Sequence, residues 1–495
     1  MAPSPAVEYR FGMAGALAPM VTFLAGVAWL GFAGAPDERG LWPVLLASLG
    51  VGLLLARDRD GYAQAALAGM ARTIVMIMVM AWVLAGVFSA VLQASGLVHS
   101  LIWVGGQAGL GGGGFVVGAF LVAVLFSTAT GTSLGTILVC APLLYPASGL
   151  LEADPAWTIG AVLAGATFGD NVSPVSDTTI ASASSQGAEM GKVVRTRLRY
   201  ALPAAAVAVA VLFLAGGTGV TLERIAERVA GGAHPANLSG DPIALPMLLA
   251  PLLVFAALLR RRGLLESLFL GVTAAIVIAL GFGLIAAGDL LYIDAEAFRA
   301  RGLIVDGMDR AVGIVLFTLL LMAVLGGVEA SGAVERLLDW SRARNQSARR
   351  TELRMFGLVS TAVLVTTHSV VAILAVGPAV RRLGEQQGIG PLRRANLLDT
   401  TVCTYPFLLP FFIPTVLAAS ATASGADFGL APTSALAAGM RNPYSWALLG
   451  VILVAIVTGW GREDPRWGEE GTEISSKPRS PTDPETPPDE RTRGA

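Results

Sequence analysis

The chain has 495 residues, of which 54% are hydrophobic and only 14% charged, and its mean hydropathy is +0.67. Soluble domains carry about 25% charged residues, so the composition excludes an ordinary soluble protein and indicates a polytopic membrane protein. The formal net charge of −1 excludes nucleic acid as a partner. Cys140 and Cys403 both lie in apolar runs and predict neither a disulfide framework nor a metal site, and we expect no cofactor.

The first apolar run, 12–33, is too long for the core of a signal peptide and follows a single basic residue, Arg10. We therefore expect it to be retained as the first helix. Ten segments in all are long enough to cross a bilayer. They run over 12–33, 41–56, 73–94, 157–180, 198–216, 244–259, 264–287, 311–334, 395–422 and 443–460.

Two further apolar stretches, 113–145 and 355–380, have loops of one kind on both sides. Lys and Arg in short loops mark the cytoplasm. Basic loops flank 355–380, whereas 95–112 and 146–156, on either side of the other stretch, contain no Lys or Arg. Each stretch is therefore expected to enter and leave on one face, as a re-entrant hairpin. We expect a bacterial-type inner membrane location with both termini in the cytoplasm.

The two halves of the chain repeat each other. "QASGLVHSL" (93–101) matches "EASGAVERL" (329–337), and "TGTSLGTI" (130–137) matches "TTHSVVAI" (366–373). Loop charges place the two copies on opposite sides, which predicts an all-α polytopic fold with an inverted-topology repeat and a binding site at the repeat interface. The predicted domains are a first repeat at 1–216, an extracytoplasmic connector at 217–243, a second repeat at 244–460 and a disordered cytoplasmic tail at 461–495.

The stretch "GDNVSPVSDTT" (169–179) places two carboxylates inside an apolar segment, where charges are costly and usually functional. Pro174 disfavours helix before it, so the chain should unwind around 172–173. Unwinding would expose carbonyl oxygens beside side-chain oxygens, which are the ligands that a small hard cation needs. The candidate ligands are Asp170, Ser173, Ser176, Asp177 and Thr178. A polar surface loop that only caps two helices remains the alternative.

The hairpin tips supply the second group of polar side chains. In the first hairpin these are the hydroxyls of Thr130, Thr132 and Ser133. Helix ends at such a tip direct their dipoles at a ligand, although the hydroxyls could instead bond back to their own helix. In the second hairpin His368 stands where the first has Thr132, followed by Ser369. His368 is either a proton acceptor or a neutral hydrogen-bond donor.

Glu329 follows "LGGV" where the other half has Gln93. Burial disfavours a charged carboxyl group, so we expect Glu329 to carry the coupling proton, with His368 as the second candidate. An interhelical ion pair or hydrogen bond is the alternative role for Glu329. Asp399 and Thr400 repeat the "DTT" of 177–179, and Asp399 is the counterpart of either Asp170 or Asp177.

The motif at 169–179 resembles the most distinctive motif of NhaC-type sodium/proton antiporters, a Gly-Asp followed by Ser-Pro and Ser-Asp-Thr-Thr. "ATGTSLGTI" (129–137), "LGGVEASG" (325–332) and the Asp399 region are similar as well, and the resemblance covers most of 60–460. It implies sodium/proton exchange, linked in some members to organic acids.

Two features depart from that family pattern. His368 stands where the family usually has Asn, and the stretch 397–412 lacks the Trp-Asn-Thr-Cys-Gly run of better-known members. The second half of the site is therefore the part in which we expect adaptation to another substrate.

We expect a secondary active transporter that exchanges sodium, or another monovalent cation, for protons by alternating access. Its carboxylates would be shared between cation and proton, its partners would be sodium, protons and the lipid bilayer, and assembly as a homodimer stays open. The alternative is a sodium- or proton-coupled exchanger of an organic acid or amino acid. We expect no Arg or Lys at membrane depth that could pair with an anion, and this weighs against a carboxylate as the substrate. A channel or a membrane enzyme is less supported, because neither an oligomeric filter nor a nucleophile–base or metal-ligand spacing is present.

Overall fold

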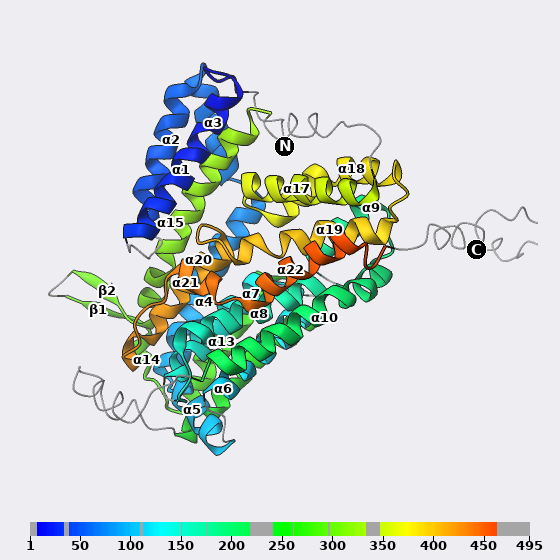
Figure 1. Cartoon of the computed structure of the whole chain (residues 1–495). Coiled ribbons are helices and arrows are strands. Elements are labelled where there is room, and N and C mark those ends of the chain that lie inside the picture. The colour runs from blue at the N-terminus through cyan, green and yellow to red at the C-terminus, as the bar shows by residue number, and fades with distance from the viewer. Residues whose placement is uncertain are drawn as a thin grey trace, which may run out of the picture.

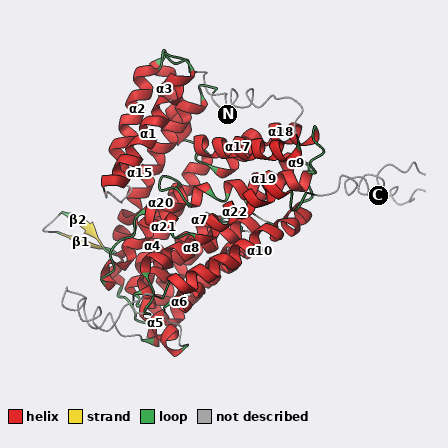
Figure 2. Ribbon diagram, viewed as in Figure 1, coloured by secondary structure: helices red, strands yellow, loops and turns green. Residues whose placement is uncertain are grey.

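The computed structural model describes residues 7–33, 39–108, 112–149, 151–174, 176–217, 241–260, 262–295, 298–332 and 347–462. Within these ranges the regular structure is almost entirely helical, and a small antiparallel hairpin of β1 (Tyr292–Asp294) and β2 (Arg299–Arg301) is the exception (Figure 2). The predicted helical class is confirmed. Most of the connector predicted at 217–243, and nearly all of the tail predicted at 461–495, lie outside the described residues.

The helices follow the predicted apolar segments closely. Those of the first half are α1 (Met13–Ala33), α2 (Leu41–Leu55), α3 (Arg59–Met70), α4 (Thr73–Ala94), α5 (Leu97–Gln107), α6 (Gly113–Thr130), α7 (Ser133–Ser148), α8 (Pro155–Val172), α9 (Asp177–Gln186) and α10 (Met190–Ala215). Those of the second half are η2 (Pro242–Leu248), α12 (Leu249–Leu259), α13 (Leu264–Gly281), α14 (Ala287–Leu290), α15 (Leu303–Glu329), α17 (Ala348–Thr366), α18 (Ser369–Glu385), α19 (Pro391–Val402), η3 (Tyr405–Phe407), α20 (Ile413–Ala421), η4 (Thr422–Phe428), α21 (Ala435–Met440) and α22 (Pro443–Thr458).

Six helices in the described part of the chain are long and apolar enough to cross a membrane, which makes this a multi-pass membrane protein. Their apolar windows are Met13–Leu30, Val75–Ala94, Gly113–Thr130, Met190–Ala215, Leu264–Gly281 and Leu303–Glu329. Five of them fall on predicted spans, and the sixth is the first arm of a predicted hairpin. Four further apolar helices are shorter, so helix length alone supports fewer crossings than the ten expected from the sequence.

The long helices α4 and α15 pack against each other and run antiparallel. At one end Arg72, just before α4, pairs with Glu329, the last residue of α15. At the other end Arg310 Nη1 donates to Gln93 Oε1 over 2.9 Å. Gln93 and Glu329 are equivalent in the repeated sequence, and each accepts from an arginine of the opposite half. Together with α1, α2 and α3, α15 forms the bundle at the upper left of Figure 1.

Two helix pairs are broken by the same backbone path. Between α6 and α7, Gly131 is left-handed (φ 69°, ψ 22°) and Thr132 is extended (φ −137°, ψ 117°). Between α17 and α18, Thr367 is left-handed (φ 47°, ψ 17°) and His368 is extended (φ −137°, ψ 119°). In each pair the two helices pack on each other, and α17 and α18 lie side by side above α19 in Figure 1. The turns fall where the sequence predicted the hairpin tips.

A second kind of break interrupts the predicted spans 157–180 and 395–422. α8 ends at Val172 and Ser173 is extended (φ −75°, ψ 130°), so the unwinding expected before Pro174 is confirmed. α19 ends at Val402, and the next α-helix, α20, begins only at Ile413. Asp170 and Asp399 therefore both lie in the last helical turn before a break, which makes Asp399 the positional counterpart of Asp170.

α8 packs closely on α6, and this places the break after Val172 beside the tip between α6 and α7. A β-carbon on Gly169 would lie 2.4 Å from the Ser127 β-carbon, so only glycine permits this approach. Ser127 Oγ also donates to the Ala166 carbonyl over 2.7 Å. The surrounding hydrophobic core contains residues of both halves, from Met20 to Ile456. The ends of α6, α7, α8 and α9 are thereby held together inside one core.

Candidate functional site

Asp170 is the centre of the site because its buried carboxylate meets hydroxyls from two other helix ends. Its side chain is only 8% exposed. Ser133 Oγ, at the start of α7, donates to Oδ2 over 2.8 Å, and Ser176 Oγ, just before α9, donates to Oδ1 over 2.5 Å. Among the described residues no Lys, Arg or His pairs with Asp170. The carboxylate has two hydroxyl donors and no fixed counterion.

Other residues of the motif extend this oxygen cluster. Thr178 Oγ1 lies 3.0 Å from Ser176 Oγ, and both side chains are buried. Ser173 is fully buried in the break between α8 and α9. The predicted partner carboxylate behaves differently, because Asp177 is exposed at the start of α9. One buried carboxylate surrounded by hydroxyl oxygens is a suitable environment for either a small hard cation or a proton.

Asp399, by contrast, already has a counterion. Arg197 forms an ion pair with it, and the side chains of both residues are 0% exposed. Arg197 Nη1 also donates to the Asn171 carbonyl over 2.6 Å and to Thr179 Oγ1 over 2.7 Å. Thr179 Oγ1 in turn donates to Asp399 Oδ2 over 3.1 Å. The α9 segment therefore contacts both aspartates, through Ser176 on one side and Thr179 on the other.

The sequence predicts no Arg or Lys at membrane depth, yet Arg197 is fully buried and paired with Asp399. The predicted span starts at residue 198, one residue after Arg197, but α10 begins at Met190 and includes it. Arg197 lies on the buried face of that helix with Val193, Tyr200 and Ala204. This spacing of three to four residues was visible in the sequence and was the signal that could have identified Arg197.

Asn171 is a second residue that the sequence analysis missed. Its side chain is fully buried, and its Oδ1 accepts a hydrogen bond from the Tyr444 hydroxyl over 3.1 Å. Its backbone carbonyl accepts from Arg197. Asn171 follows Asp170 directly in the chain and links the two aspartate regions.

Some of the predicted polar groups at the hairpin tips form hydrogen bonds, and others have no partner among the described residues. Thr132 caps α7 by accepting from the Gly135 N–H over 3.2 Å, and the buried Thr130 Oγ1 has no partner among the described residues. In the second tip His368 Nδ1 likewise has no partner within the described structure. Ser369 Oγ donates to the Val402 carbonyl over 3.4 Å, which ties this tip to the end of α19.

Two predicted groups are engaged elsewhere. Thr400 Oγ1 donates to the Asn396 carbonyl of its own helix over 2.5 Å. Glu329 is held by both terminal nitrogens of Arg72, with side chains 24% and 29% exposed. The interhelical ion pair, which was the alternative role for Glu329, is what the structure contains.

Comparison with known proteins finds sequence similarity to sodium/proton antiporters. Residues 12–217 match the family model described as the Na+/H+ antiporter family. The chain is 26% identical over 275 residues to the Na(+)/H(+) antiporter NhaC of Alkalihalophilus pseudofirmus, covering 54% of this chain and 58% of the relative. It is 24% identical over 295 residues to the Na(+)/H(+) antiporter NhaC of Bacillus subtilis, covering 55% and 62%.

A third relative is the Malate-2H(+)/Na(+)-lactate antiporter of Bacillus subtilis, 25% identical over 253 residues that cover 49% of this chain and 52% of the relative. The chain thus covers between 52% and 62% of the length of these curated relatives. The resemblance to NhaC-type sodium/proton antiporters, which the motifs predicted, is confirmed by the family model and the first two relatives.

Proposed function

We propose that the protein is a secondary sodium/proton antiporter in which Asp170 binds the cation and the proton alternately. The observation that carries the proposal is the burial of Asp170 between two hydroxyl donors, with no fixed cationic partner among the described residues. The matched family model and the two relatives named as Na(+)/H(+) antiporters support the same activity.

Coupling follows from the cost of leaving a buried charge uncompensated. A carboxylate in this environment is stable when a cation neutralises it or when it carries a proton, and the empty charged form is disfavoured. Cation and proton therefore compete for one group. With sodium bound, the oxygens of Asp170, Ser133, Ser176 and Thr178 would supply ligands. With a proton bound, the neutral acid would keep its hydroxyl neighbours as hydrogen-bond partners.

Asp399 has a different part in this proposal. Arg197 neutralises it permanently, so Asp399 anchors α9 and α19 beside the site and does not itself exchange its counterion. Thr179 transmits that anchoring, because it bonds to both members of the pair.

The proton-coupling roles expected of Glu329 and His368 become secondary. Arg72 occupies both oxygens of Glu329, so we place the exchanged proton on Asp170 and assign Glu329 and His368 a modulating effect on the pH profile. Glu329→Gln and His368→Asn should therefore shift the pH optimum and still exchange. If Glu329→Gln loses proton coupling while cation binding persists, the proton belongs on Glu329.

We further propose that α6–α7 and α17–α18 are re-entrant hairpins of an inverted repeat, with the repeats at 1–216 and 244–460 and both termini cytoplasmic. The identical backbone path of the two tips supports this arrangement. Single cysteines at Gly96 and Asp154 should then label from one side of the membrane, and cysteines at Ser347 and Gln386 from the other. Labelling of either pair from opposite sides would contradict the hairpins.

Transport by the purified full chain in liposomes tests the activity directly. A trapped pH-sensitive dye should report proton movement on addition of sodium, and the signal should be compared with lithium, potassium, malate and amino acids. We expect sodium to be sufficient for proton movement, with no malate or amino acid required. No response to any monovalent cation would contradict the proposal.

Sodium-linked exchange of an organic acid is the second candidate. The relative named as a Malate-2H(+)/Na(+)-lactate antiporter favours it. So does the buried Arg197 Nη2, which has no partner in the described part of the chain and would suit a carboxylate. Proton movement that requires malate in addition to sodium would select this candidate.

A further inference from the structure

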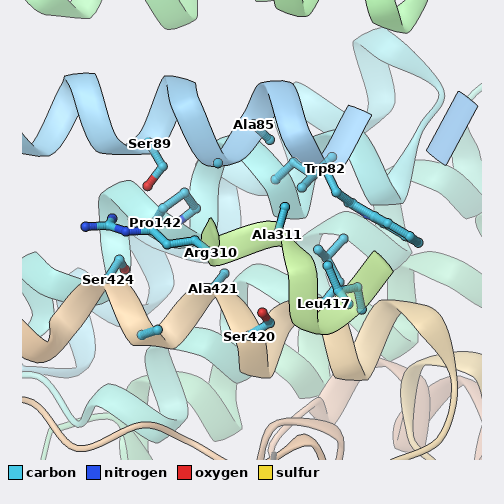
Figure 3. Close-up of a pocket in the computed structure, with 14 residues that line it drawn as sticks. Trp82, Ala85, Ser89, Pro142, Arg310, Ala311, Leu417, Ser420, Ala421 and Ser424 are labelled. Carbon is cyan, nitrogen blue, oxygen red and sulfur yellow. The ribbon is translucent and has the colours of Figure 1, made fainter. Parts of the chain in front are cut away.

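A cavity whose lining does not include Asp170 lies where α4, α7 and α15 meet the α20–η4 segment (Figure 3). Its volume is about 70 Å³. Leu138 and Pro142 of α7 form part of its wall, five and nine residues beyond Ser133. At 1.5 Å of rise per residue the cavity begins about 8 Å along α7 from the Asp170 site. The two sites share a helix and no side chain.

One end of this cavity is polar and cationic. Arg310 stands at its mouth, and its side chain extends between Ser89 of α4 and Ser424 of η4 (Figure 3). Arg310 donates one hydrogen bond, to Gln93, and no acidic side chain in the described ranges pairs with it. Arg310 is exposed, and a guanidinium has five N–H donors, so it has donors left for a ligand within the described structure.

The two serines add donors beside the guanidinium. Ser424 is only 5% exposed, and its Oγ has no hydrogen-bond partner in the described residues. Ser89 is 7% exposed, and its Oγ accepts from Gln93 Nε2 over 2.8 Å, which leaves its own proton available. A buried hydroxyl without a partner is unfavourable. These donors indicate that an acceptor belongs in the cavity.

The other end of the cavity is apolar. Trp82, Ile314 and Leu417 line it, and Figure 3 shows Trp82 and Leu417 at the end opposite to Ser89 and Ser424. An inorganic anion would use only the polar end. A molecule with a planar anionic head and a short hydrocarbon tail would use both.

We propose that this cavity binds a small aliphatic carboxylate, with its carboxylate on Arg310, Ser89 and Ser424 and its tail between Trp82 and Leu417. The planar guanidinium matches a carboxylate through two parallel hydrogen bonds. The volume limits the ligand to an acid of a few carbons, because drug-sized ligands need roughly 300 Å³ or more. Binding here does not depend on the proposed cation exchange.

Titration calorimetry of the full chain in nanodiscs, without sodium, tests this proposal with the N-methylglucamine salt of butyrate as the probe. Saturable binding is expected for the wild type, weakened at least ~10-fold by Arg310→Gln. Ser424→Ala should weaken binding about threefold, and Arg310→Lys, which keeps the charge and loses the planar fork, should fall between wild type and Arg310→Gln.

Arg299→Gln is the matched control, because Arg299 is an exposed arginine on β2 outside the cavity. It should bind butyrate as the wild type does, and equal melting temperatures should show that every variant is folded. The proposal is overturned by an absence of saturable binding, by equal binding to Arg310→Gln, or by chloride that displaces butyrate at equal concentration. Chloride displacement would indicate a simple anion site at the polar end alone.

Discussion

Asp170 and Asp399 occupy matching positions in the two halves, each in the last turn of a helix that ends in a break. Both are buried, yet their partners differ completely. Asp170 accepts from two serine hydroxyls, whereas Asp399 is paired with the buried Arg197. The repeated backbone supplies two similar places for a carboxylate, and the surrounding side chains decide which one has a fixed counterion among the described residues.

The two hairpin tips likewise share a backbone conformation and differ in their side chains. The first tip uses Gly131 and a capping Thr132, and the second uses Thr367 and an uncapped His368. A β-branched residue at positive φ is strained, so the second tip adopts at a cost the conformation that glycine adopts freely. In the proposed mechanism the first half would bind the ion, and the strained second tip belongs to the half whose aspartate has a fixed partner.

Of the changes that test the difference between the two aspartates, neutralising Asp170 should have the largest effect on exchange. Asp170→Asn keeps the shape and removes the charge, so exchange in proteoliposomes should fall to background while the protein remains folded by size-exclusion chromatography. Asp177→Asn is the matched control, because Asp177 is exposed. It should keep most of the activity. Exchange that survives in Asp170→Asn and disappears in Asp177→Asn would reverse the assignment.

Breaking the ion pair of Arg197 and Asp399 should reduce stability more than it affects ion binding. Arg197→Gln leaves Asp399 buried without a counterion, a change that costs about 3–5 kcal/mol. The melting temperature in detergent should therefore drop strongly. The double variant Arg197→Gln/Asp399→Asn should recover most of the loss, because it removes both charges. If Arg197→Gln is as stable as the wild type, Asp399 does not need Arg197.

Removing the hydroxyls around Asp170 should have an intermediate effect. Because the proposed sodium site uses both serine oxygens as ligands, Ser133→Ala and Ser176→Ala should each weaken the apparent sodium affinity by about tenfold. Ser184→Ala, on the exposed side of α9, provides the control. Unchanged sodium dependence in both site variants would remove these serines from the cation site.

The strain at the second tip should give the smallest effect. Thr367→Gly relaxes a residue at φ 47° and should stabilise the protein by about 1 kcal/mol. Gly131→Ala makes the opposite change at the equivalent position of the first tip, φ 69°, and should destabilise it by a similar amount. Thermal unfolding of the two variants measures both shifts. A destabilising Thr367→Gly would show that the threonine side chain is needed there.

Much of this arrangement was predictable from the sequence. Composition and apolar runs gave the helical membrane class, Pro174 gave the break after Val172, and the repeated motifs gave the matching hairpin tips. Ser133 and Ser176 were predicted as ligands because hydroxyls cluster around a carboxylate that an apolar segment would otherwise exclude, and both donate to Asp170 in the structure.

The partner of Asp399 was missed for a physical reason. Loop charges report which side a segment faces only when the helix ends before the basic residues. α10 begins at Met190, so Arg197 lies within the helix and turns inward. The break after Val402 was also missed, although Pro406 and Pro410 interrupt that apolar stretch and could have indicated it.

Proton release on sodium binding tests the central claim most directly. Sodium added to purified, weakly buffered protein should displace protons from the wild type in proportion to the sodium bound. The folded double variant Arg197→Gln/Asp399→Asn should release them as well, because its Asp170 is intact. Asp170→Asn should release none. Wild-type proton release from Asp170→Asn, or its loss only in the double variant, would contradict the assignment of the exchanging carboxylate to Asp170.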